Sequence, residues 1–410
     1  MKKVSNSAQY FEHEHLCLNE AQKSIAHGAL TNSKRLSSFV AGVYPAYVTR
    51  AHNEKFYTFD DKAYVDYLGA LGTNFFGYSN KSINLAISNA LPAGTLFSLG
   101  SPSEVEYARM FKAKFSYVDK IRILKSGSEG CSAAVRIART YTGRDRVLSE
   151  GYHGWHDEFT SLTPPAKGVP KNRYNMKKFS WSFLTEDIAA VIIEPVMIDY
   201  GPLRREFVSR LRNVCDQKGI LLIFDETITG LRFKKLSVAN YWGIEPDITI
   251  MGKALANGLP LSVVGGRAGV MDSDYFVSST FAGERLSLEA AIECLKLVSG
   301  EYNPMYVWEQ GQEFIDKMNE ALNPVMDFLG YPTRGILTGN KMIKTLFCQE
   351  MCKLGWFFHP ETWFFNRYLH SHTDHVAQTA NIVLKRILAG DVKLEGLTYE
   401  SPIKKDEYNA

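Results

Sequence analysis

The middle of the chain alternates between short apolar runs and segments with helical or loop character. Six runs are bounded by glycine, proline or aspartate: 121–127 (IRILKSG), 146–152 (RVLSEGY), 189–196 (AAVIIEPV), 220–226 (ILLIFDE), 247–253 (DITIMGK) and 261–267 (LSVVGGR). Runs that are apolar on both faces are typical of strands covered by helices on both sides. The pattern from about residue 80 onward therefore predicts an α/β domain with a largely parallel sheet.

The regions on either side have other patterns. The first stretch, to about Leu36, is polar with helical spacing and is expected to pack as an N-terminal arm. Residues 46–60 and 63–70 contain short β-like pieces, with a turn predicted at Asn53–Glu54. Residues 287–298 (SLEAAIECLKLV) predict a long helix that leaves the α/β domain.

The length of 410 residues is more than one simple core accommodates, and it predicts a large domain with a smaller companion. We expect residues 1–60 to form the N-terminal arm and part of the small domain. Residues 61–295 would form the large domain, and residues 296–410 a C-terminal small domain of α+β character. The sequence has neither internal repeats nor a low-complexity linker between these parts.

Composition and charge argue against several classes of protein. The chain is 45% hydrophobic and 22% charged, which is ordinary for a globular protein and argues against disorder. No segment approaches the ~18 consecutive apolar residues of a membrane span. No apolar segment follows Lys2 and Lys3, so we expect no signal peptide. A net charge of +3 is too small at this length to indicate nucleic acid or an acidic membrane as the main partner.

The six cysteines are scattered without paired spacing. Cys348 and Cys352 would share one helix face, with His359 beyond them. Buried free cysteines are common, however, and no second pair of ligands appears in the sequence. We therefore expect no metal site, and we expect a reducing, cytoplasmic setting.

The predicted sheet directs attention to the residues that follow each apolar run, because ligands bind beyond the carboxyl ends of such strands. These positions hold a glycine loop, an aromatic residue, carboxylates and one lysine: Ser126–Ser128, Tyr152–His153, Glu194–Pro195, Asp225–Glu226 and Gly252–Lys253. One apolar run thus delivers two adjacent carboxylates from an apparently buried strand. Since bare charge in an apolar site is costly, a cationic partner is expected from elsewhere in the chain or from a cofactor.

The glycine loop opens the segment KSGSEGCSAAVRIARTYTG, which runs from a strand end into a predicted helix. Gly127 and Ser128 at that helix start would present backbone N–H groups and a hydroxyl to an anion. An ordinary N-cap explains the same residues, and both interpretations stay open. The G-x-G-x-x-G spacing of a dinucleotide site is absent, and MGKALANG (251–258) lacks the upstream glycine of a phosphate-binding P-loop.

Lys253 and Asp225 form the most informative pair. Alone, a lysine at a buried strand end can snorkel or pair with a carboxylate, and an aspartate is more often a salt-bridge partner or a metal ligand. The two lie 253 − 225 = 28 residues apart on successive predicted strands. Together they match what pyridoxal 5′-phosphate (PLP) requires, namely a desolvated lysine that forms a Schiff base and an ionised aspartate against the ring nitrogen. Tyr152 could stack on that ring or belong to the core, and Thr227 could pack near the other ring face.

The ordered set of motifs resembles the class III aminotransferases, which are fold-type I PLP-dependent enzymes, and is most similar to glutamate-1-semialdehyde aminomutase-like members. The motifs are KSGSEG…AAVRIARTYTGRD, EGYHGWHD, VIIEPV, LLIFDETITGLRF, PDITIMGKALANGLPLSVVGGR and STFAGE. The similarity covers roughly residues 40 to 390. It implies a large domain with a mainly parallel seven-stranded sheet and helices on both faces, and a smaller α+β domain built from both termini.

The resemblance also implies a role for each matching residue. Lys253 would be the Schiff-base lysine and the proton shuttle, and Asp225 would hold the pyridine nitrogen. Gly127 and Ser128 would bind the phosphate at their helix start, and Tyr152 would stack on the ring. The implied catalytic residues are therefore Lys253, Asp225 and Tyr152.

Three further positions complete the implied cofactor site. Glu194 would lie near the site behind its strand end, and Thr227 would lie beside the ring. Thr280 in STFAGE matches the family's threonine that reaches the phosphate of the neighbouring subunit's cofactor, so the active site would require a homodimer. The other implied partners are a small-molecule amino donor and a carbonyl acceptor.

The part of the sequence that would contact the substrate departs from the aminomutase pattern. Segment 37–50 (SSFVAGVYPAYVTR) is shorter and lacks an arginine where the aminomutase places one against the substrate carboxylate. Segment 361–375 (ETWFFNRYLHSHTDH) puts Phe364 where the aminomutase has a glutamate. In 280–291 (TFAGERLSLEAA) the Thr-Leu-Ser-Gly-Asn-Pro pattern is replaced. The new pattern resembles relatives associated with carbohydrate and cell-surface gene sets, which would imply an amino- or keto-sugar-like substrate.

Three functions are compatible with these residues. A transaminase would take an amino group from a donor and pass it to a carbonyl acceptor by ping-pong chemistry, with Lys253 as the base in each half. An intramolecular aminomutase of the glutamate-1-semialdehyde 2,1-aminomutase type would retain one substrate under a lid, for which 162–175 (LTPPAKGVPKNRYN) is a candidate. A non-catalytic descendant is disfavoured because Lys253 and Asp225 are both present. The substrate itself stays open, with His153 and Arg232 among the residues that could contact it.

Overall fold

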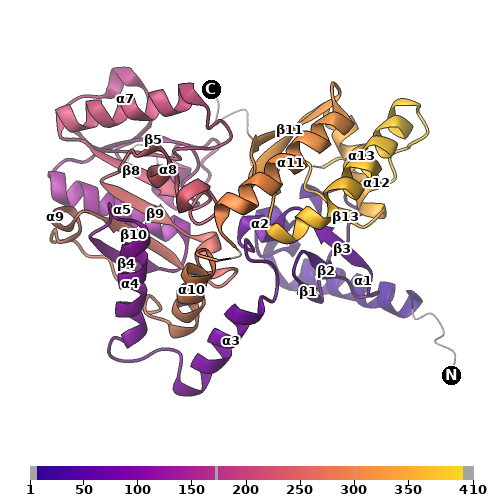
Figure 1. Cartoon of the computed structure of the whole chain (residues 1–410), viewed down its shortest axis with the longest axis horizontal. Coiled ribbons are helices and arrows are strands. Elements are labelled where there is room, and N and C mark those ends of the chain that lie inside the picture. The colour runs from indigo at the N-terminus through magenta and orange to yellow at the C-terminus, as the bar shows by residue number, and fades with distance from the viewer. Residues whose placement is uncertain (1–6, 171–173, 301, 400–410) are drawn as a thin grey trace. The chain divides into compact units, whose positions relative to one another are not determined.

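A computed structural model of the chain describes residues 7–170, 174–300 and 302–399 (Figure 1). The chain forms two compact units. The first contains the residues up to Leu71, Phe76–Asn80 and the residues from Glu309 on, and the second contains Gly72–Phe75 and Lys81–Trp308. These limits lie later in the chain than the boundaries predicted after residues 60 and 295, which stay predictions.

A seven-stranded sheet forms the centre of the second unit. The strands are β4 (Lys120–Leu124), β5 (Arg146–Glu150), β6 (Met176–Lys178), β7 (Ile188–Ile193), β8 (Leu221–Glu226), β9 (Ile248–Met251) and β10 (Ser262–Gly266). Their order is β4-β10-β9-β8-β7-β5-β6. Strands β9, β8, β7, β5 and β6 run parallel, and β10 is antiparallel to both of its neighbours. The predicted mainly parallel, seven-stranded sheet is confirmed.

Six of these strands coincide with the six predicted apolar runs, whereas β6 was not predicted. Its sequence is Met-Lys-Lys, its two lysines are exposed, and it lies at the edge of the sheet. An edge strand pairs on one side only and is often short and charged. It therefore needs no apolar run, and this kind of strand leaves little signal in the sequence.

Helices cover both faces of the sheet (Figure 1). The helices of this unit are α3 (Lys81–Ala90), α4 (Pro102–Lys114), α5 (Gly127–Thr142), α6 (Asp157–Thr160), α7 (Pro202–Lys218), α8 (Val238–Trp242), α9 (Ala268–Met271) and α10 (Arg285–Leu297). Helix α5 buries an apolar stripe that includes Cys131, Ala134 and Ile137 against the strands. Helix α10 contains residues 287–297 of the segment 287–298 that was predicted to be helical.

The two faces of β8 are buried under different helices. Leu221 and Ile223 belong to the core cluster that α5 covers. Since successive side chains of a strand point to opposite faces, Asp225 points to the α5 face and Glu226 points to the other face. The two adjacent carboxylates are thereby separated by the sheet itself.

The first unit is an α+β assembly drawn from both ends of the chain, as the resemblance implied. One sheet has the order β1-β2-β3-β13 and the other has the order β11-β12-β14. The strands are β1 (Arg50–His52), β2 (Lys55–Tyr57), β3 (Ala63–Asp66), β11 (Met326–Tyr331), β12 (Arg334–Gly339), β13 (Trp356–Phe357) and β14 (Trp363–Phe364). The main helices are α1 (Ser7–Ser24), α11 (Pro304–Leu322), α12 (Lys341–Lys353) and α13 (Thr373–Leu388).

Two local predictions fall in this unit. His52 pairs with Lys55 in the register of β1 and β2, so the predicted turn at Asn53–Glu54 is confirmed. Cys348 and Cys352 are buried in α12. The ring of His359 lies edge-on to Phe39 at a centroid distance of 5.2 Å, in an aromatic core.

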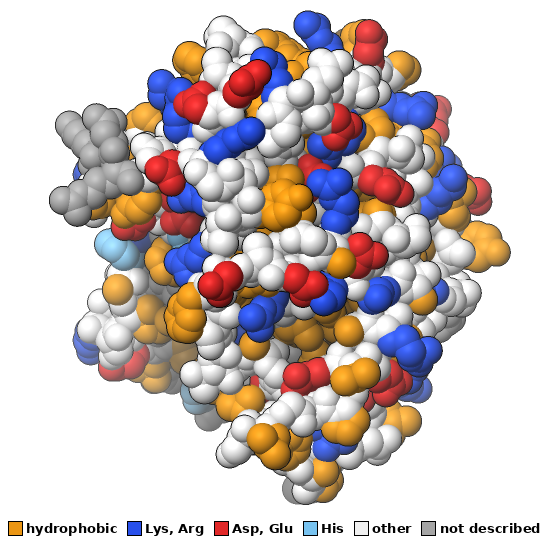
Figure 2. Space-filling model, turned by 90° about the vertical axis from the view of Figure 1, so that its left-hand side faces the viewer, with side chains coloured by type: hydrophobic (Ala, Val, Ile, Leu, Met, Phe, Trp, Pro, Cys, Tyr) orange, Lys and Arg blue, Asp and Glu red, His pale blue; other side chains and the backbone are white. Residues whose placement is uncertain are grey.

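Charged side chains of both signs are interspersed on the face of the molecule shown in Figure 2. This distribution agrees with the small net charge of +3. Among the described residues, no helix combines the length and the apolar character needed to cross a membrane.

Candidate active site

Lys253 stands directly beyond the carboxyl end of β9. The strand ends at Met251, which is in register with Glu226 of the neighbouring β8, and Lys253 begins a short 3-10 turn after Gly252. The backbone φ of Lys253 is 47°, a left-handed conformation that is costly for a residue with a side chain. Such strain is common at functional sites, and the buried residues 254–256 hold it in place.

Asp225 is buried, with 6% of its surface exposed, and its carboxylate accepts hydrogen bonds at both oxygens. Oδ1 accepts from the backbone N–H and the hydroxyl of Thr227, at 3.0 and 2.5 Å. Oδ2 lies 2.8 Å from Nδ1 of His153 and accepts from the thiol of Cys131 at 3.3 Å. Burial alone raises the pKa of Asp225, but the hydrogen bond and charge of His153 and the bonds from Thr227 outweigh it and lower the pKa. This carboxylate is therefore ionised.

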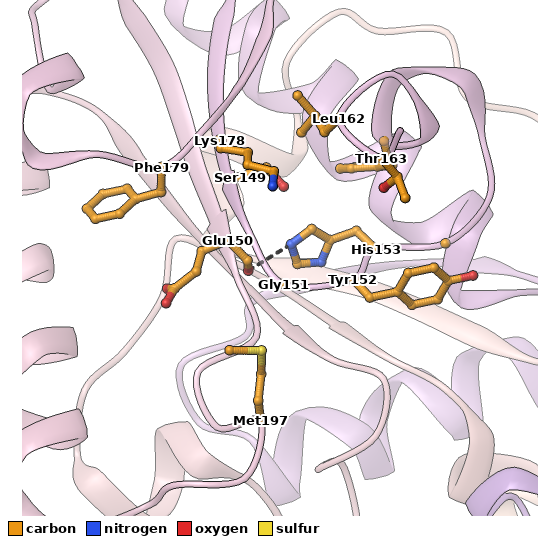
Figure 3. A pocket seen from close by; sticks show the side chains of 12 residues that line it. Ser149, Glu150, Gly151, Tyr152, His153, Leu162, Thr163, Lys178, Phe179 and Met197 are labelled. Atoms are coloured by element: carbon orange, nitrogen blue, oxygen red, sulfur yellow. Dashed lines mark hydrogen bonds between the residues drawn. The ribbon is translucent and has the colours of Figure 1, made fainter. Parts of the chain in front are cut away.

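His153 provides a hydrogen-bonding partner for Asp225. Its Nδ1 faces the Asp225 carboxylate, and its Nε2 lies 3.1 Å from the backbone carbonyl oxygen of Glu150 (Figure 3). Both contacts are to oxygen atoms, which accept hydrogen bonds. The sequence had suggested His153 only as a possible substrate contact.

Glu226 has a separate role on the opposite face of the sheet. Its carboxylate accepts hydrogen bonds from the backbone N–H groups of Val238 and Ala239, at 2.7 and 3.2 Å, and from the hydroxyl of Thr229 at 2.8 Å. Val238 and Ala239 open helix α8, so Glu226 caps that helix. Burial raises the pKa of Glu226 to about 7 in spite of these bonds. Glu226 is thus a structural carboxylate.

The loop that carries Tyr152 is tied to β7. The backbone N–H of Tyr152 donates to Oε1 of the buried Glu194 at 2.8 Å. Gly151, at a φ of 108°, packs so closely on Glu194 that an added Cβ would lie 2.9 Å from the same carboxylate oxygen. Glu194 thereby fixes the backbone at Tyr152, while the Tyr152 ring is 46% exposed and available to a ligand.

The same loop is tied to α5. Gly154, at a φ of 96°, passes so close to Ser128 that an added Cβ would lie 2.1 Å from its hydroxyl oxygen. The backbone N–H of Trp155 points to that oxygen at 3.4 Å, and Nδ1 of His156 lies 2.7 Å from the hydroxyl of Ser132. The motif EGYHGWHD therefore locks two strand ends and one helix start together, which explains why it contains two glycines.

The start of α5 has the geometry of an anion site. Ser126 caps the helix in a capping box with Glu129. Gly127 and Ser128 lie in the first turn, where backbone N–H groups have no partner within the helix. A Cβ on Gly127 would lie 2.8 Å from Cγ2 of Thr227, so this loop has no room for a side chain. The N-cap and the anion site, which the sequence left as alternatives, are thus compatible features of one helix start.

A cavity of about 340 Å³ lies next to Tyr152 and His153 (Figure 3). The described residues that line it are Ser149, Glu150, Gly151, Tyr152, His153, Gly154, Phe159, Leu162, Thr163, Lys178, Phe179 and Met197. Leu162 and Thr163 belong to the segment 162–175 that was considered as a lid. Lys171, Asn172 and Arg173 of that segment lie outside the described residues.

Two further residues that the sequence suggested for the site differ in their burial. Thr280 is exposed in the loop before α10, beside the exposed rings of Phe276 and Phe281. Arg232 is 1% exposed, donates a hydrogen bond to the carbonyl oxygen of Gly72 and lies over the ring of Phe75. A packing role therefore accounts for the contacts of Arg232.

Cys131, His153 and Asp225 also have the composition of a metal-ligand set. Their Sγ, Nδ1 and carboxylate oxygen atoms all lie within 4.8 Å of one another. Two ligands of a tetrahedral zinc, each about 2.0 to 2.3 Å from the metal, stand more than ~3 Å apart. The Nδ1–Oδ2 distance of 2.8 Å is shorter and is typical of a charge-assisted hydrogen bond. The arrangement is therefore that of a hydrogen-bonded carboxylate.

Comparison with known proteins identifies the family. The family described as Aminotransferase class-III matches residues 39–345. The glutamate-1-semialdehyde 2,1-aminomutase of Archaeoglobus fulgidus is 33% identical to this chain over 282 residues, which cover 62% of this chain and 68% of that protein. The family match spans both the cofactor motifs and part of the first unit.

Solved structures support the fold. The FumI protein of Sphingopyxis sp. MTA144, in a PLP-bound form, superposes with a TM-score of 0.85 at 23% identity, covering 95% of this chain and 99% of that one. A β-phenylalanine aminotransferase from Variovorax paradoxus gives 0.80 at 19% identity, with coverage of 94% and 96%. A glutamate-1-semialdehyde aminomutase from Pseudomonas aeruginosa PAO1 gives 0.79 at 17% identity, with coverage of 92% and 95%. The chain belongs to the class-III aminotransferases, an enzyme family of fold type I whose cofactor is PLP.

Proposed function

We propose that this enzyme is a transaminase, which moves an amino group from a small-molecule donor to a carbonyl acceptor by ping-pong chemistry through a Schiff base at Lys253. The observation that carries the proposal is the placement of Lys253 and the ionised Asp225 at the carboxyl ends of adjacent parallel strands. A desolvated amine beside a fixed anion is the constellation that PLP chemistry requires.

The residues fit the cofactor at three points. Asp225 offers a buried, ionised carboxylate to a protonated ring nitrogen. Gly127 and Ser128 offer the amide groups of a helix start to a phosphate, in a loop too tight for a side chain. Tyr152 offers an exposed ring, held by Glu194 through the backbone, for stacking. In this proposal Thr227 lies on the other side of the ring.

The protein's own groups would divide the work as follows. When bound, PLP supplies an electron sink that stabilises negative charge at the substrate Cα. Nζ of Lys253 would accept the proton from the Cα of the donor in the first half-reaction and deliver a proton to the Cα of the product amine in the second, acting as base and acid in turn. Asp225 stays ionised and keeps the ring nitrogen protonated, because its carboxylate is held by His153 and Thr227.

We further propose that the active unit is a homodimer in which Thr280 reaches the cofactor of the neighbouring subunit. The proposal is supported by the exposure of Thr280 and of apolar side chains in the same unit. Leu99 is 85% exposed, and Phe276 and Phe281 are 79% and 58% exposed. Exposed apolar side chains that gather in one patch mark interaction surfaces. The expected cytoplasmic setting stays a prediction.

An intramolecular aminomutase is the second candidate. It is supported by the 33% identity to the aminomutase of Archaeoglobus fulgidus and by the position of Leu162 and Thr163 at the cavity beside Tyr152. It is opposed by Phe364, which replaces the glutamate of the aminomutase, and by the missing arginine in 37–50. These departures favour the transaminase.

Half-reactions separate the two candidates. The purified enzyme, loaded with PLP, is screened with amino donors in the absence of an acceptor. A transaminase releases about one equivalent of keto product per subunit and then stops until an acceptor is added. Continued isomerisation of one compound without a second partner would favour the aminomutase. Protein that stays colourless and does not bind added PLP would contradict both.

A further inference from the structure

Cys131 is a buried thiol with a polar contact that the proposed function does not use. It lies in α5, four residues or about one helical turn after Gly127. Only 1% of its surface is exposed. Its Sγ donates a hydrogen bond to Oδ2 of Asp225 at 3.3 Å. Helix α5 therefore contributes two features to the site, the backbone amides of its first turn and the thiol that donates to Asp225.

The Asp225 carboxylate is held from three directions. Thr227 supplies both donors to Oδ1 from the adjoining turn. His153 and Cys131 supply the donors to Oδ2, from positions 72 and 94 residues away in the chain. Rotation of the carboxylate would break bonds on both oxygens at once. Without Cys131, Oδ2 would depend on His153 alone.

A thiol suits this position because it combines a hydrogen-bond donor with a small side chain. The S–H group restricts the carboxylate and fills the space under α5 with a small apolar atom. The burial of the carboxylate and the thiol together keeps water from taking this position.

We propose that Cys131 is a positioning residue for the reaction, whose thiol holds Asp225 in the orientation that meets the cofactor ring nitrogen. The inference rests on the proposed function for the role of Asp225. It is distinct from simple core packing, which would need the volume of the sulfur atom and not its hydrogen. Serine and alanine substitutions separate the two roles, because serine keeps a donor and alanine removes it.

The first test observes the hydrogen bond directly and does not need the cofactor. Infrared spectra of the purified protein and of Cys131→Ala are subtracted in the S–H stretching region. We expect the lost band to lie at lower frequency than the bands of the other thiols, and to move to higher frequency in Asp225→Asn. A lost band at the frequency of a free thiol, unchanged in Asp225→Asn, would overturn the proposal.

The second test measures the dissociation constant of PLP by fluorescence titration. Cys131→Ala should raise it about fivefold, the effect of one hydrogen bond, and Cys131→Ser should restore it to within about twofold of the original value. Cys294, buried in α10 of the same unit, provides matched controls. Cys294→Ala and Cys294→Ser should leave the dissociation constant unchanged. Equal effects of alanine and serine at position 131 would show a packing role and overturn the proposal.

The two tests also separate this inference from the proposed function. If PLP does not bind at all while the shifted S–H band is present, the proposed function fails and the contact of Cys131 with Asp225 stands. Tight binding of zinc that is lost in Cys131→Ala and that prevents PLP binding would instead assign the three residues to a metal centre and overturn the positioning role. Should Cys131→Ala fail to fold, the band shift in Asp225→Asn still decides the question.

Discussion

The two faces of the sheet at the end of β8 carry adjacent carboxylates with opposite properties. Asp225 and Glu226 are both buried, at 6% and 0% exposure. The pKa of Asp225 is lowered because the interactions with His153 and Thr227 outweigh its burial, whereas burial raises the pKa of Glu226 to about 7 in spite of its hydrogen bonds. Burial alone therefore does not decide the charge of a carboxylate, and its interaction partners contribute as well.

The different partners of Asp225 and Glu226 indicate different roles for the two faces of the sheet. The Asp225 face is built from side chains that converge on one carboxylate, and Lys253 stands at the same edge of the sheet. The Glu226 face is built from backbone amides at the start of α8. We therefore expect substitutions on the first face to affect turnover and those on the second to affect folding.

The largest expected effect is that of Lys253→Ala. Removing the amine removes both the point of attachment and the base, so turnover should fall by at least about 10⁴-fold while some cofactor stays bound noncovalently. Steady-state turnover and the absorption spectrum of the bound cofactor measure both. Lys235 is a matched control, because it is an exposed lysine with a φ of 53°, and Lys235→Ala should leave turnover unchanged. Retained activity in Lys253→Ala would refute the assignment.

The next test compares one alanine substitution on each face of the sheet. Asp225→Ala should lower kcat/KM by more than about 10²-fold, because the ring nitrogen loses its anion. Glu226→Ala should retain kcat/KM per folded molecule but lower the free energy of unfolding by about 3 kcal/mol, because two amides and a hydroxyl lose their acceptor. Urea unfolding and initial rates are measured on both variants. Equal effects on kcat/KM would abolish the distinction between the faces.

The pH dependence of stability sharpens the comparison. In the folded protein Glu226 keeps its proton up to a pKa of about 7, while in the unfolded chain it releases it near 4.5. The folded state thus binds more protons between these values, and its stability should fall as the pH rises from 4.5 to 7, by on the order of 3 kcal/mol. Asp225 has the opposite effect, because its pKa is lowered in the folded protein. Its contribution to the stability of the fold is lost as the pH falls below the ordinary aspartate pKa of 3.8.

Glu226→Gln isolates this contribution because glutamine does not titrate. The melting temperature of the variant should depend less on pH between 4.5 and 7 than that of the unaltered protein. Scanning fluorimetry across this range measures the two slopes. Identical slopes in the two proteins would assign the pH dependence to other groups.

The smallest expected effect is that of Thr280→Val. If the hydroxyl reaches the neighbouring subunit's phosphate, PLP should dissociate about three- to tenfold faster, in line with the loss of one hydrogen bond. Thr280→Ser keeps the hydroxyl and serves as the matched variant, with little change expected. The rate of PLP loss on gel filtration is compared at protein concentrations above and below the dissociation constant of the dimer. An unchanged rate in Thr280→Val would argue against a shared site.

Much of the fold could be predicted because local patterns determine it. The six internal apolar runs predicted six strands, since a strand covered on both sides must be apolar along its length. The edge strand β6 was not predicted, because a strand at the edge of a sheet can be short and polar, as its Met-Lys-Lys sequence is. The Asn53–Glu54 turn was predictable because hairpin geometry is set by the two residues of the turn.

The candidate site was only partly predictable. Asp225 and Lys253 could be singled out because each follows an apolar run directly. The contacts of His153 and Cys131 with Asp225 could not, because they join residues 72 and 94 positions apart. A signal for His153 existed in its place beside Tyr152 at a strand end, but nothing in the sequence distinguished Cys131 from the other buried cysteines.

By itself the sequence determined that two carboxylates emerge from a buried strand and that a lysine emerges from the next one, because these are consequences of order along the chain. Only the tertiary structure decided which carboxylate faces His153 and Cys131 and which one caps a helix. The pleat of β8 sends Asp225 and Glu226 to opposite faces, and the helix that packs on each face supplies its partners. Those packing choices depend on contacts between distant segments, and the ionisation of Asp225 follows from one of them, the imidazole of His153.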